Sequence, residues 1–113
     1  MDNFLILIRE DIAEVSKMSD AEMQLEVEAY TQWVEGLAAS DHFISGEPLE
    51  ARGKYMTKEQ VSSDGPFIES KEVVTGFILI KAANLDEAVE LSKTCPIFKS
   101  NGGALEVRPV MKY

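Results

Sequence analysis

The sequence predicts an α+β fold in which two helices cover one face of a four-stranded antiparallel sheet. Two runs of strand length, residues 4–8 and 76–80, are wholly apolar apart from one glycine. Each run is followed by a segment whose apolar residues recur at helical spacing. A segment in which apolar and polar residues alternate, residues 105–110, follows the second of these. Strands and helices therefore alternate along the chain in two similar halves.

The first half begins with a predicted strand and a long helix. Residues 4–8 predict a buried strand because no helical spacing extends this apolar run. Residues 11–18 predict a polar loop with room for one helical turn. Ser19 and Glu22 have the spacing of a capping box, in which the hydroxyl accepts from a free amide and the carboxylate reaches back. The helix is predicted over residues 20–40, and its inner stripe consists of Met23, Val27, Tyr30, Val34 and Leu37.

The middle of the chain predicts a strand, a small hairpin and a turn. Residues 42–46 have the composition of a strand. The strand is predicted to end at Gly46-Glu47-Pro48-Leu49, because proline cannot donate a hydrogen bond to a central ladder. Residues 53–63 predict a short hairpin that turns at Lys58-Glu59. Asp64-Gly65-Pro66-Phe67 predicts a turn, since aspartate accepts from nearby amides and glycine and proline favour turn conformations.

The second half repeats the order of the first. Residues 76–80 predict a second buried strand, and Asn84 caps a second helix that Pro96 ends. The buried side of this helix is predicted to contain Leu85, Ala88, Val89, Leu91 and Cys95. Residues 105–110 predict a last strand with one polar side. The resulting order is the ferredoxin-like βαββαβ arrangement with a small hairpin insertion.

Composition narrows the class of protein. We expect a single domain over residues 1–113, because a chain of this length has room for one. The net charge of −9 argues against nucleic acid and anionic membranes as partners. One cysteine, Cys95, and one histidine, His42, exclude an intrachain disulfide and a histidine cluster, so we expect no metal and no cofactor. The apolar run at residues 4–8 is too short to span a bilayer, and we expect a cytoplasmic protein.

The two apolar strands predict a homodimer. Two helices cover only one face of the sheet, and a face that met water should carry polar residues at alternate positions. Residues 4–8 and 77–80 are apolar on both faces, so about four large side chains lie on the uncovered face. Their burial by a second copy is worth on the order of 6–10 kcal/mol before the costs of association. The alternative is that the loops at residues 49–63 fold over the sheet, although these loops are polar.

Four stretches of the sequence resemble a known family. They are Gly46-Glu47-Pro48-Leu49, the run 64–72 that begins Asp-Gly-Pro-Phe, Gly76-Phe77, and the run 102–110. In this order they resemble the YCII-related family, in the branch marked by the Asp-Gly-Pro-Phe motif. The resemblance covers nearly the whole chain and implies a dimeric α+β barrel, in which two ferredoxin-like protomers close into one barrel.

The resemblance implies less about activity than about fold. Many members have no assigned activity, and related domains occur beside extracytoplasmic-function sigma factors. One branch contains a dehydrochlorinase thought to use a His–Asp pair, with the histidine on the first helix. The present chain has no histidine in residues 19–40, and Tyr30 falls near the expected position.

Several side chains are candidates for a site. Asp64 is the candidate general base, and its alternative is a turn residue that caps its own loop. His42 is either a proton shuttle or a structural residue, and Tyr30 is either an auxiliary donor or part of the packing. The ligand-binding candidates, each of which also has a purely structural alternative, are Glu47, Pro48, Phe67, Lys71, Trp33 and Arg108.

These candidates leave two functions open, and with them the question of whether the protein is an enzyme. The first is a metal-free acid–base enzyme for a small polar organic molecule. In it Asp64 is the base, Tyr30 or His42 an auxiliary donor, and Lys71 or Arg108 the charge clamp. The second is a non-catalytic dimer that binds a ligand or a regulatory protein. Neither the substrate, the physiological partner nor any assembly beyond the dimer follows from the sequence.

Overall fold

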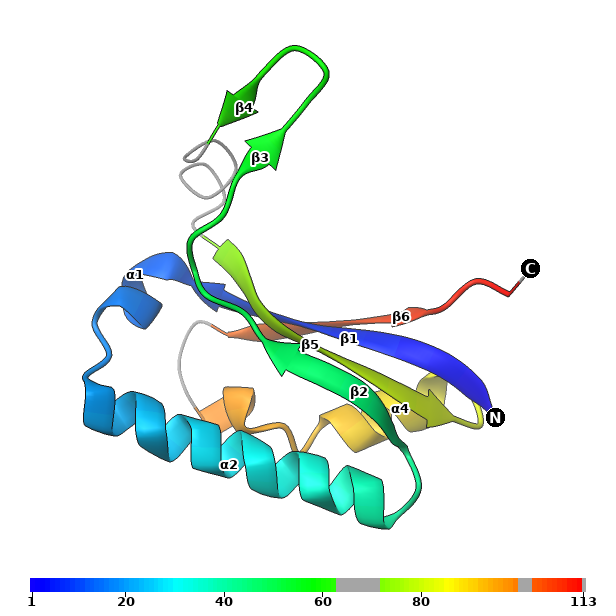
Figure 1. Cartoon of the computed structure of the whole chain (residues 1–113). Helices are drawn as coiled ribbons and strands as arrows, with labels where there is room; N and C mark the ends of the chain where they lie inside the picture. The colour runs from blue at the N-terminus through cyan, green and yellow to red at the C-terminus, as the bar shows by residue number, and fades with distance from the viewer. Residues whose placement is uncertain (63–71, 100–102, 113) are drawn as a thin grey trace.

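The computed structural model describes residues 1–62, 72–99 and 103–112. Its elements follow the predicted order, with a short helix added after the first strand and a 3-10 turn after the last helix (Figure 1). They are β1 (Asp2–Asp11), α1 (Ile12–Ser16), α2 (Asp20–Ala39), β2 (Phe43–Pro48), β3 (Tyr55–Met56), β4 (Val61–Ser62), β5 (Glu72–Ala82), α4 (Leu85–Ser92), η1 (Pro96–Lys99) and β6 (Ala104–Pro109).

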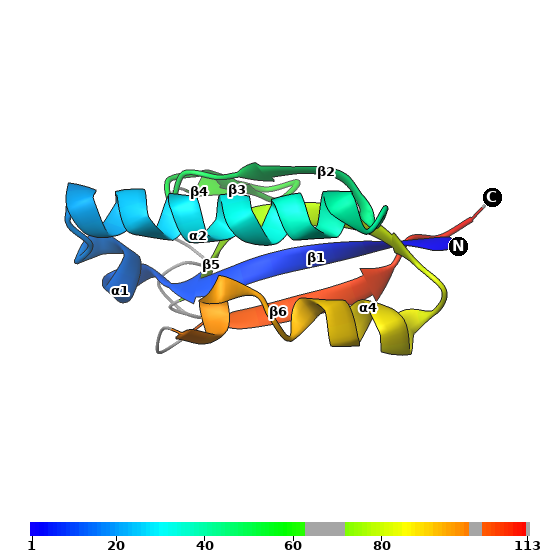
Figure 2. The ribbon, with the colours of Figure 1, turned by 90° about the horizontal axis from the view of Figure 1, so that it is seen from below.

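Four strands form the main sheet in the order β2-β5-β1-β6, and each neighbouring pair is antiparallel. The two long apolar strands, β1 and β5, lie in the centre. Helices α2 and α4 cover the same face of this sheet (Figure 2). The predicted ferredoxin-like α+β fold is therefore confirmed. Pro48 ends the edge strand β2, where the lack of an amide proton costs no central hydrogen bond.

The core lies between the sheet and the helices. Side chains of β1 alternate between the two faces of the sheet, and Phe4, Ile6 and Ile8 point to the helix side and are buried. They meet residues of β5, α2, α4 and η1 in one cluster: Ile78, Ile80, Ala82, Leu37, Ala88, Cys95 and Ile97. Full burial of an isoleucine side chain contributes about 1.5–3 kcal/mol, so this cluster fixes the helices on the sheet.

The opposite face of the sheet, here called the open face, has no helix over it. Leu5 is paired with Leu79, and Leu7 with Phe77, and all four side chains are half-buried. These four residues form the apolar centre of the open face, as the alternation predicts. Its two edges are polar, because the same two rows of residues continue into Ser45 and Glu47 on β2 and into Arg108 and Glu106 on β6.

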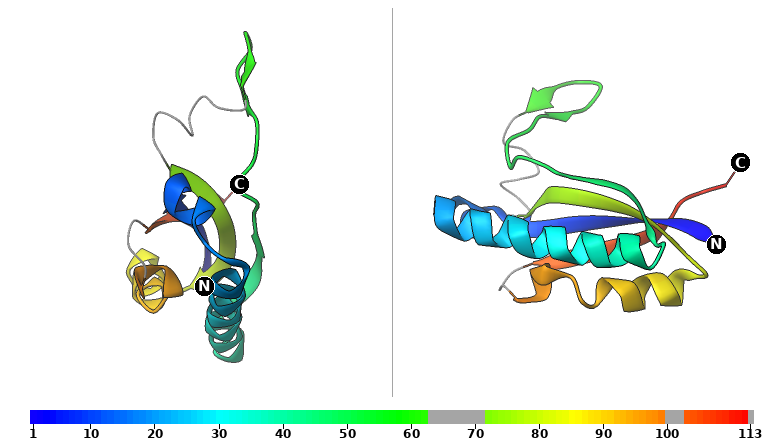
Figure 3. Two further views of the ribbon diagram at one scale, coloured as in Figure 1. Left: turned by 90° about the vertical axis from the view of Figure 1, so that its left-hand side faces the viewer. Right: turned by 60° about the horizontal axis from the view of Figure 1, so that its bottom comes forward.

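The loops after β2 do not cover the open face. Residues 49–61 are exposed apart from Ala51. The β3–β4 hairpin stands clear of the main sheet in both views of Figure 3. In the structure these loops therefore do not fold over the sheet, which was the alternative to burial of the open face by a second copy.

Three details of the predicted helices are wrong. Met23 and Val27 of the predicted inner stripe are 47% and 57% exposed. The first turn of α2 extends past the sheet, and beyond it the inner side of the helix passes through Glu26 and Tyr30 instead of Val27. The second helix ends at Ser92, and Pro96 begins η1 instead of ending α4. Proline is tolerated in a first turn, where its missing amide proton has no partner. Leu85 and Val89, predicted to be buried, are both exposed.

The stability of the protein should depend on the glycine at position 46. A Cβ at this position lies 2.8 Å from the carbonyl oxygen of Phe77, so Gly46→Ala must push β2 away from β5. We expect a loss of about 1–3 kcal/mol in the free energy of unfolding, measured by urea denaturation. Gly36→Ala is the matched control: a Cβ there meets nothing within 4 Å, and alanine in a helix is favoured by about 0.5–1 kcal/mol. Equal stability of the two variants would contradict this account of the β2–β5 contact.

Candidate functional site

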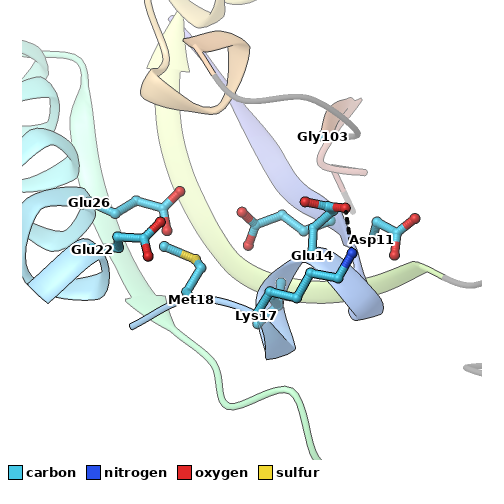
Figure 4. Close-up of a pocket in the computed structure, with 9 residues that line it drawn as sticks. Asp11, Glu14, Lys17, Met18, Glu22, Glu26 and Gly103 are labelled. Atoms are coloured by element: carbon cyan, nitrogen blue, oxygen red, sulfur yellow. Dashed lines mark ion pairs between the residues drawn. The ribbon is translucent and has the colours of Figure 1, made fainter. Parts of the chain in front are cut away.

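A cavity of about 240 Å³ opens where the end of β1, helix α1 and the start of α2 meet (Figure 4). Nine residues line it: Glu10, Asp11, Glu14, Val15, Lys17, Met18, Glu22, Glu26 and Gly103. The local sequence builds this shape. Asp11 ends β1 and caps α1 by accepting from the amide of Ala13, and the capping box at Ser19 and Glu22 starts α2. The chain therefore bends around the cavity, because α1 and α2 begin one shortly after the other.

The cavity is strongly acidic. Among the described residues, five carboxylates and one cation line it, and this cation, Lys17, pairs with Glu14 at 3.6 Å. Figure 4 shows Glu22 and Glu26 on the α2 side and this ion pair on the α1 side. Such a lining attracts positively charged groups and repels anions. Within the described ranges, no group of three or more His, Cys, Asp or Glu residues is arranged to hold a metal ion.

A cluster of four polar side chains adjoins the cavity. It consists of Glu10 and Glu26, which line the cavity, and of Tyr30 and Cys95, which lie behind them in the core. Glu26 and Tyr30 are one helical turn apart on α2 and so project from the same side of it. Glu10 accepts a hydrogen bond from the hydroxyl of Thr75 on β5. The cluster therefore joins α2, β1 and the segment between α4 and η1.

The hydroxyl of Tyr30 is the unusual atom of this cluster. It is buried, and among the described residues no group forms a hydrogen bond of normal geometry with it. The thiol of Cys95 lies close enough to interact with it. A buried hydroxyl without a partner costs about 1–3 kcal/mol. A ligand oxygen or a water molecule that reached the hydroxyl would remove this cost.

Burial raises the pKa of three side chains of this cluster. Burial, together with the neighbouring carboxylate of Glu10, raises the pKa of Glu26. Burial, followed by Cys95 and Glu10, raises the pKa of Tyr30 well above its ordinary value, and burial likewise raises the pKa of the Cys95 thiol. The phenol is therefore a hydrogen-bond donor at neutral pH. Glu26 can exchange a proton nearer to neutral pH than an exposed carboxyl does.

Two of the predicted site residues lie beside this cluster. Tyr30 belongs to it, and the ring of Trp33 meets the ring of Tyr30 edge to face at 6.4 Å. The indole N–H of Trp33 donates to the hydroxyl of Thr94 at 3.1 Å, which fixes the ring between α2 and the end of α4. Both residues pack against the core cluster.

His42 lies at the other end of α2. Its Nδ1 is 2.8 Å from the carbonyl oxygen of Lys81, and its amide donates to the carbonyl of Leu37. The α2 helix has 20 residues and is therefore about 30 Å long, with the cavity at its start and His42 beyond its end. The structure does not bring His42 to the cavity.

Glu47, Pro48 and Arg108 also lie away from the cavity. Glu47 shares a row with Phe77 on the open face, and Arg108 shares a row with Leu5 on the same face. The two belong to opposite edge strands, three strand spacings or about 14 Å apart. Arg108 pairs with Glu106 at 3.1 Å, and Glu106 also pairs with Arg9, and both contacts lower the pKa of Glu106. Pro48 is exposed at the end of β2.

The remaining predicted residues, Asp64, Phe67 and Lys71, lie outside the described residues. Their roles stay predictions. Two residues of the site were not among the candidates, namely Glu10 and Glu26. A signal for Glu26 exists in the sequence, since it lies four residues before Tyr30 and seven before Trp33, on the inner side of the helix.

None of the helices in residues 1–62, 72–99 and 103–112 combines the length and the apolar character needed to cross a membrane.

Comparison with known proteins gives a family and a fold. One solved structure with a similar fold is 5-chloro-2-hydroxyhydroquinone dehydrochlorinase (TftG) from Burkholderia phenoliruptrix AC1100, in complex with 2,5-dihydroxybenzoquinone. It matches with a TM-score of 0.53 and 19% identity over 96% of this chain and 93% of that chain, and at this identity the likeness shows the fold alone. A curated relative is the uncharacterized protein R00369 of Rhizobium meliloti (strain 1021), which is 38% identical over 60 residues. This alignment spans 53% of the chain and 48% of the relative, about half the length of each. The YCII-related domain matches residues 3–113, and the chain therefore belongs to the YCII-related family.

Proposed function

We propose that the protein is a cytoplasmic homodimer that performs acid–base chemistry on a small polar organic molecule bound in the acidic cavity. One observation carries the proposal: the carboxyls of Glu10 and Glu26 line the cavity, and the buried hydroxyl of Tyr30, which interacts with the Cys95 thiol, belongs to the same cluster. A carboxyl with a raised pKa and a phenol that stays protonated, side by side at a cavity, are groups that general acid–base catalysis uses.

Each of the three side chains has a distinct role in this proposal. Glu26 exchanges a proton with the substrate, because its raised pKa brings proton release closer to neutral pH. Tyr30 stays protonated and donates a hydrogen bond to a substrate oxygen. Glu10 disfavours a negative charge on Glu26 and so adds to the rise in its pKa that burial causes.

The lining restricts the ligand by size and charge. A cavity of about 150 Å³ can hold a benzene molecule, so about 240 Å³ accommodates a single ring with polar substituents. The dehydrochlorinase of similar fold is named for a substrate of this size class. Five carboxylates against one paired lysine favour a neutral or positively charged ligand over an anion. The structure therefore favours the acid–base proposal without an anion clamp by Arg108, which belongs to the open face.

The open face supports the homodimer. Leu5, Leu7, Phe77 and Leu79 are half-buried in the protomer and form one apolar patch with polar edges. Packing against a second copy would bury them, and a two-fold axis lets the same patch serve both partners. The polar edges, with Glu47 on one side and Arg108 on the other, would form the rim of such an interface.

Three probes of similar shape and different charge test the proposed site: benzylamine, benzyl alcohol and benzoate. Thermal-shift titrations should show stabilisation by benzylamine and benzyl alcohol and the weakest effect with benzoate. Glu26→Gln should reduce the preference for benzylamine, whereas Glu35→Gln, on the exposed side of α2, should leave it unchanged. Strongest binding of benzoate, or an order that Glu26→Gln does not alter, would contradict the proposed lining.

A second candidate, a ligand-binding dimer without turnover, is favoured by the absence of a histidine on α2, where the dehydrochlorinase branch of the family is expected to carry one. Binding of the probes at the cavity, with no turnover of a library of ring compounds by the wild type, would support this candidate over the enzyme.

A further inference from the structure

The β3–β4 hairpin, here called the arm (residues 55–62), carries three exposed apolar side chains. Tyr55, Met56 and Val61 are 46%, 69% and 58% exposed. The turn is closed locally, because the amide of Thr57 donates to the carbonyl of Gln60 at 2.7 Å. An isolated two-stranded hairpin is marginally stable in water, so this arm lacks the packing that a hairpin of its kind needs.

The arm lies on the side of the sheet that carries the open face. In Figure 1 the helices lie below the sheet and the arm rises above it, from the β2 edge. Figure 2, seen from the helix side, shows the arm behind β2, and both views of Figure 3 agree. The radius of gyration, 15.1 Å, exceeds the value of about 13 Å expected for a compact domain of this length.

The open face alone is small for a stable dimer. Four strands about 4.8 Å apart, two of six residues at the edges and two of ten and eleven in the centre, give a footprint on the order of 500 Å². A standard interface buries about 800 Å² on each partner. A protomer stacked on the open face would lie beside the arm, because packed sheets are about 10 Å apart and the arm rises on that side. Contact with the arm would supply part of the missing area.

We infer that the arm of each protomer packs against the other protomer in the dimer and buries Tyr55, Met56 and Val61 there. The inference rests on the proposed homodimer and names what completes its interface. A two-fold axis makes the contact reciprocal, so two arms contribute to one interface. The partner of the arm is a second copy of this chain. A copy that stacks on the open face lies beside the arm, and the open face is a surface that the fold already presents.

The double variant Met56→Ser/Val61→Ser tests the contact. Sedimentation equilibrium should show a dimer dissociation constant about 10- to 100-fold larger than that of the wild type. The matched control, Leu25→Ser/Val27→Ser, removes two side chains that are 67% and 57% exposed on α2, on the helix side of the sheet, and should leave the constant unchanged. Amide hydrogen exchange of residues 55–61 should be slower at protein concentrations above the dimer dissociation constant than at concentrations below it.

The outcomes separate the arm from the dimer. The arm contact alone would be overturned if Leu79→Arg dissociated the dimer while the arm variant dimerised with wild-type affinity. A wild type that remains a monomer at micromolar concentration would overturn the homodimer and the arm contact together. An arm variant and a control that weaken the dimer equally would also contradict a specific role for the arm.

Discussion

Leu79→Arg should convert the proposed homodimer into monomers. Leu79 lies on β5 in the centre of the open face, directly opposite Leu5 of β1. In the dimer an arginine at this position is buried against the partner sheet with no opposite charge nearby, and the two-fold axis introduces it twice. An uncompensated buried charge costs about 3–5 kcal/mol, so the affinity should fall by more than about 100-fold. Size-exclusion chromatography with light scattering measures the change directly.

Val89→Arg is the control for the open-face variant. Val89 is 41% exposed on α4, on the helix side of the sheet. The variant adds the same charge to the protein without touching the open face, and it should remain dimeric. Persistence of the dimer in Leu79→Arg would show that the copies associate through another surface.

Glu26→Gln should have the largest effect on turnover. General acid–base groups contribute about 10²- to 10⁴-fold to rate, and glutamine keeps the shape of the side chain while losing the exchangeable proton. With a substrate found by screening ring compounds, kcat should fall by this factor while binding persists. Glu35→Gln should retain wild-type kcat. An unchanged kcat in Glu26→Gln would remove this residue from the reaction.

The pH dependence of Glu26→Gln has a defined sign. The folded-state pKa of Glu26 is raised above its ordinary value of 4.5. If Glu26 acts as an acid, activity falls as pH rises through this folded-state pKa, and the variant lacks that limb. Stability follows the same direction: the contribution of Glu26 is fully present below 4.5 and is lost as pH rises through the folded-state pKa. The variant should therefore gain stability relative to the wild type as pH increases.

Local chemistry made much of the fold predictable. The start of α2 followed from the capping box at Ser19 and Glu22, and the start of α4 from the Asn84 side chain, which accepts from the amide of Glu87. These contacts involve residues three positions apart and need no tertiary structure. The apolar runs predicted the central strands for a similar reason. Their real length did not follow, since β1 reaches Asp11 only because β5 pairs with it.

Exposure along the helices could not be predicted from spacing. The periodic stripe of α2 includes Met23 and Val27, which are exposed: Met23 lies where the helix extends past the sheet, and at the level of Val27 the neighbouring Glu26 takes the inner position. How far a helix extends past a sheet depends on strand length and on the connection, and both are tertiary properties.

The candidate site was predictable in part. Tyr30 and Trp33 were among the candidates, and both pack against the core behind the cavity without lining it. Glu10 and Glu26 were missed because a carboxylate in sequence is expected on the surface. Glu47 became a candidate through its place at a strand end and Arg108 through its place on the polar side of the last strand, but the distance between them depends on which edge each strand occupies. That order is set by pairing across the whole sheet.

A carboxyl titration by carbon-detected NMR tests the proposed site most directly. The proposal predicts one glutamate carboxyl that titrates above 4.5, that disappears from the spectrum of Glu26→Gln, and that shifts when benzylamine is added. A spectrum in which the Glu26 carboxyl titrates at or below that value, unaffected by benzylamine, would contradict it.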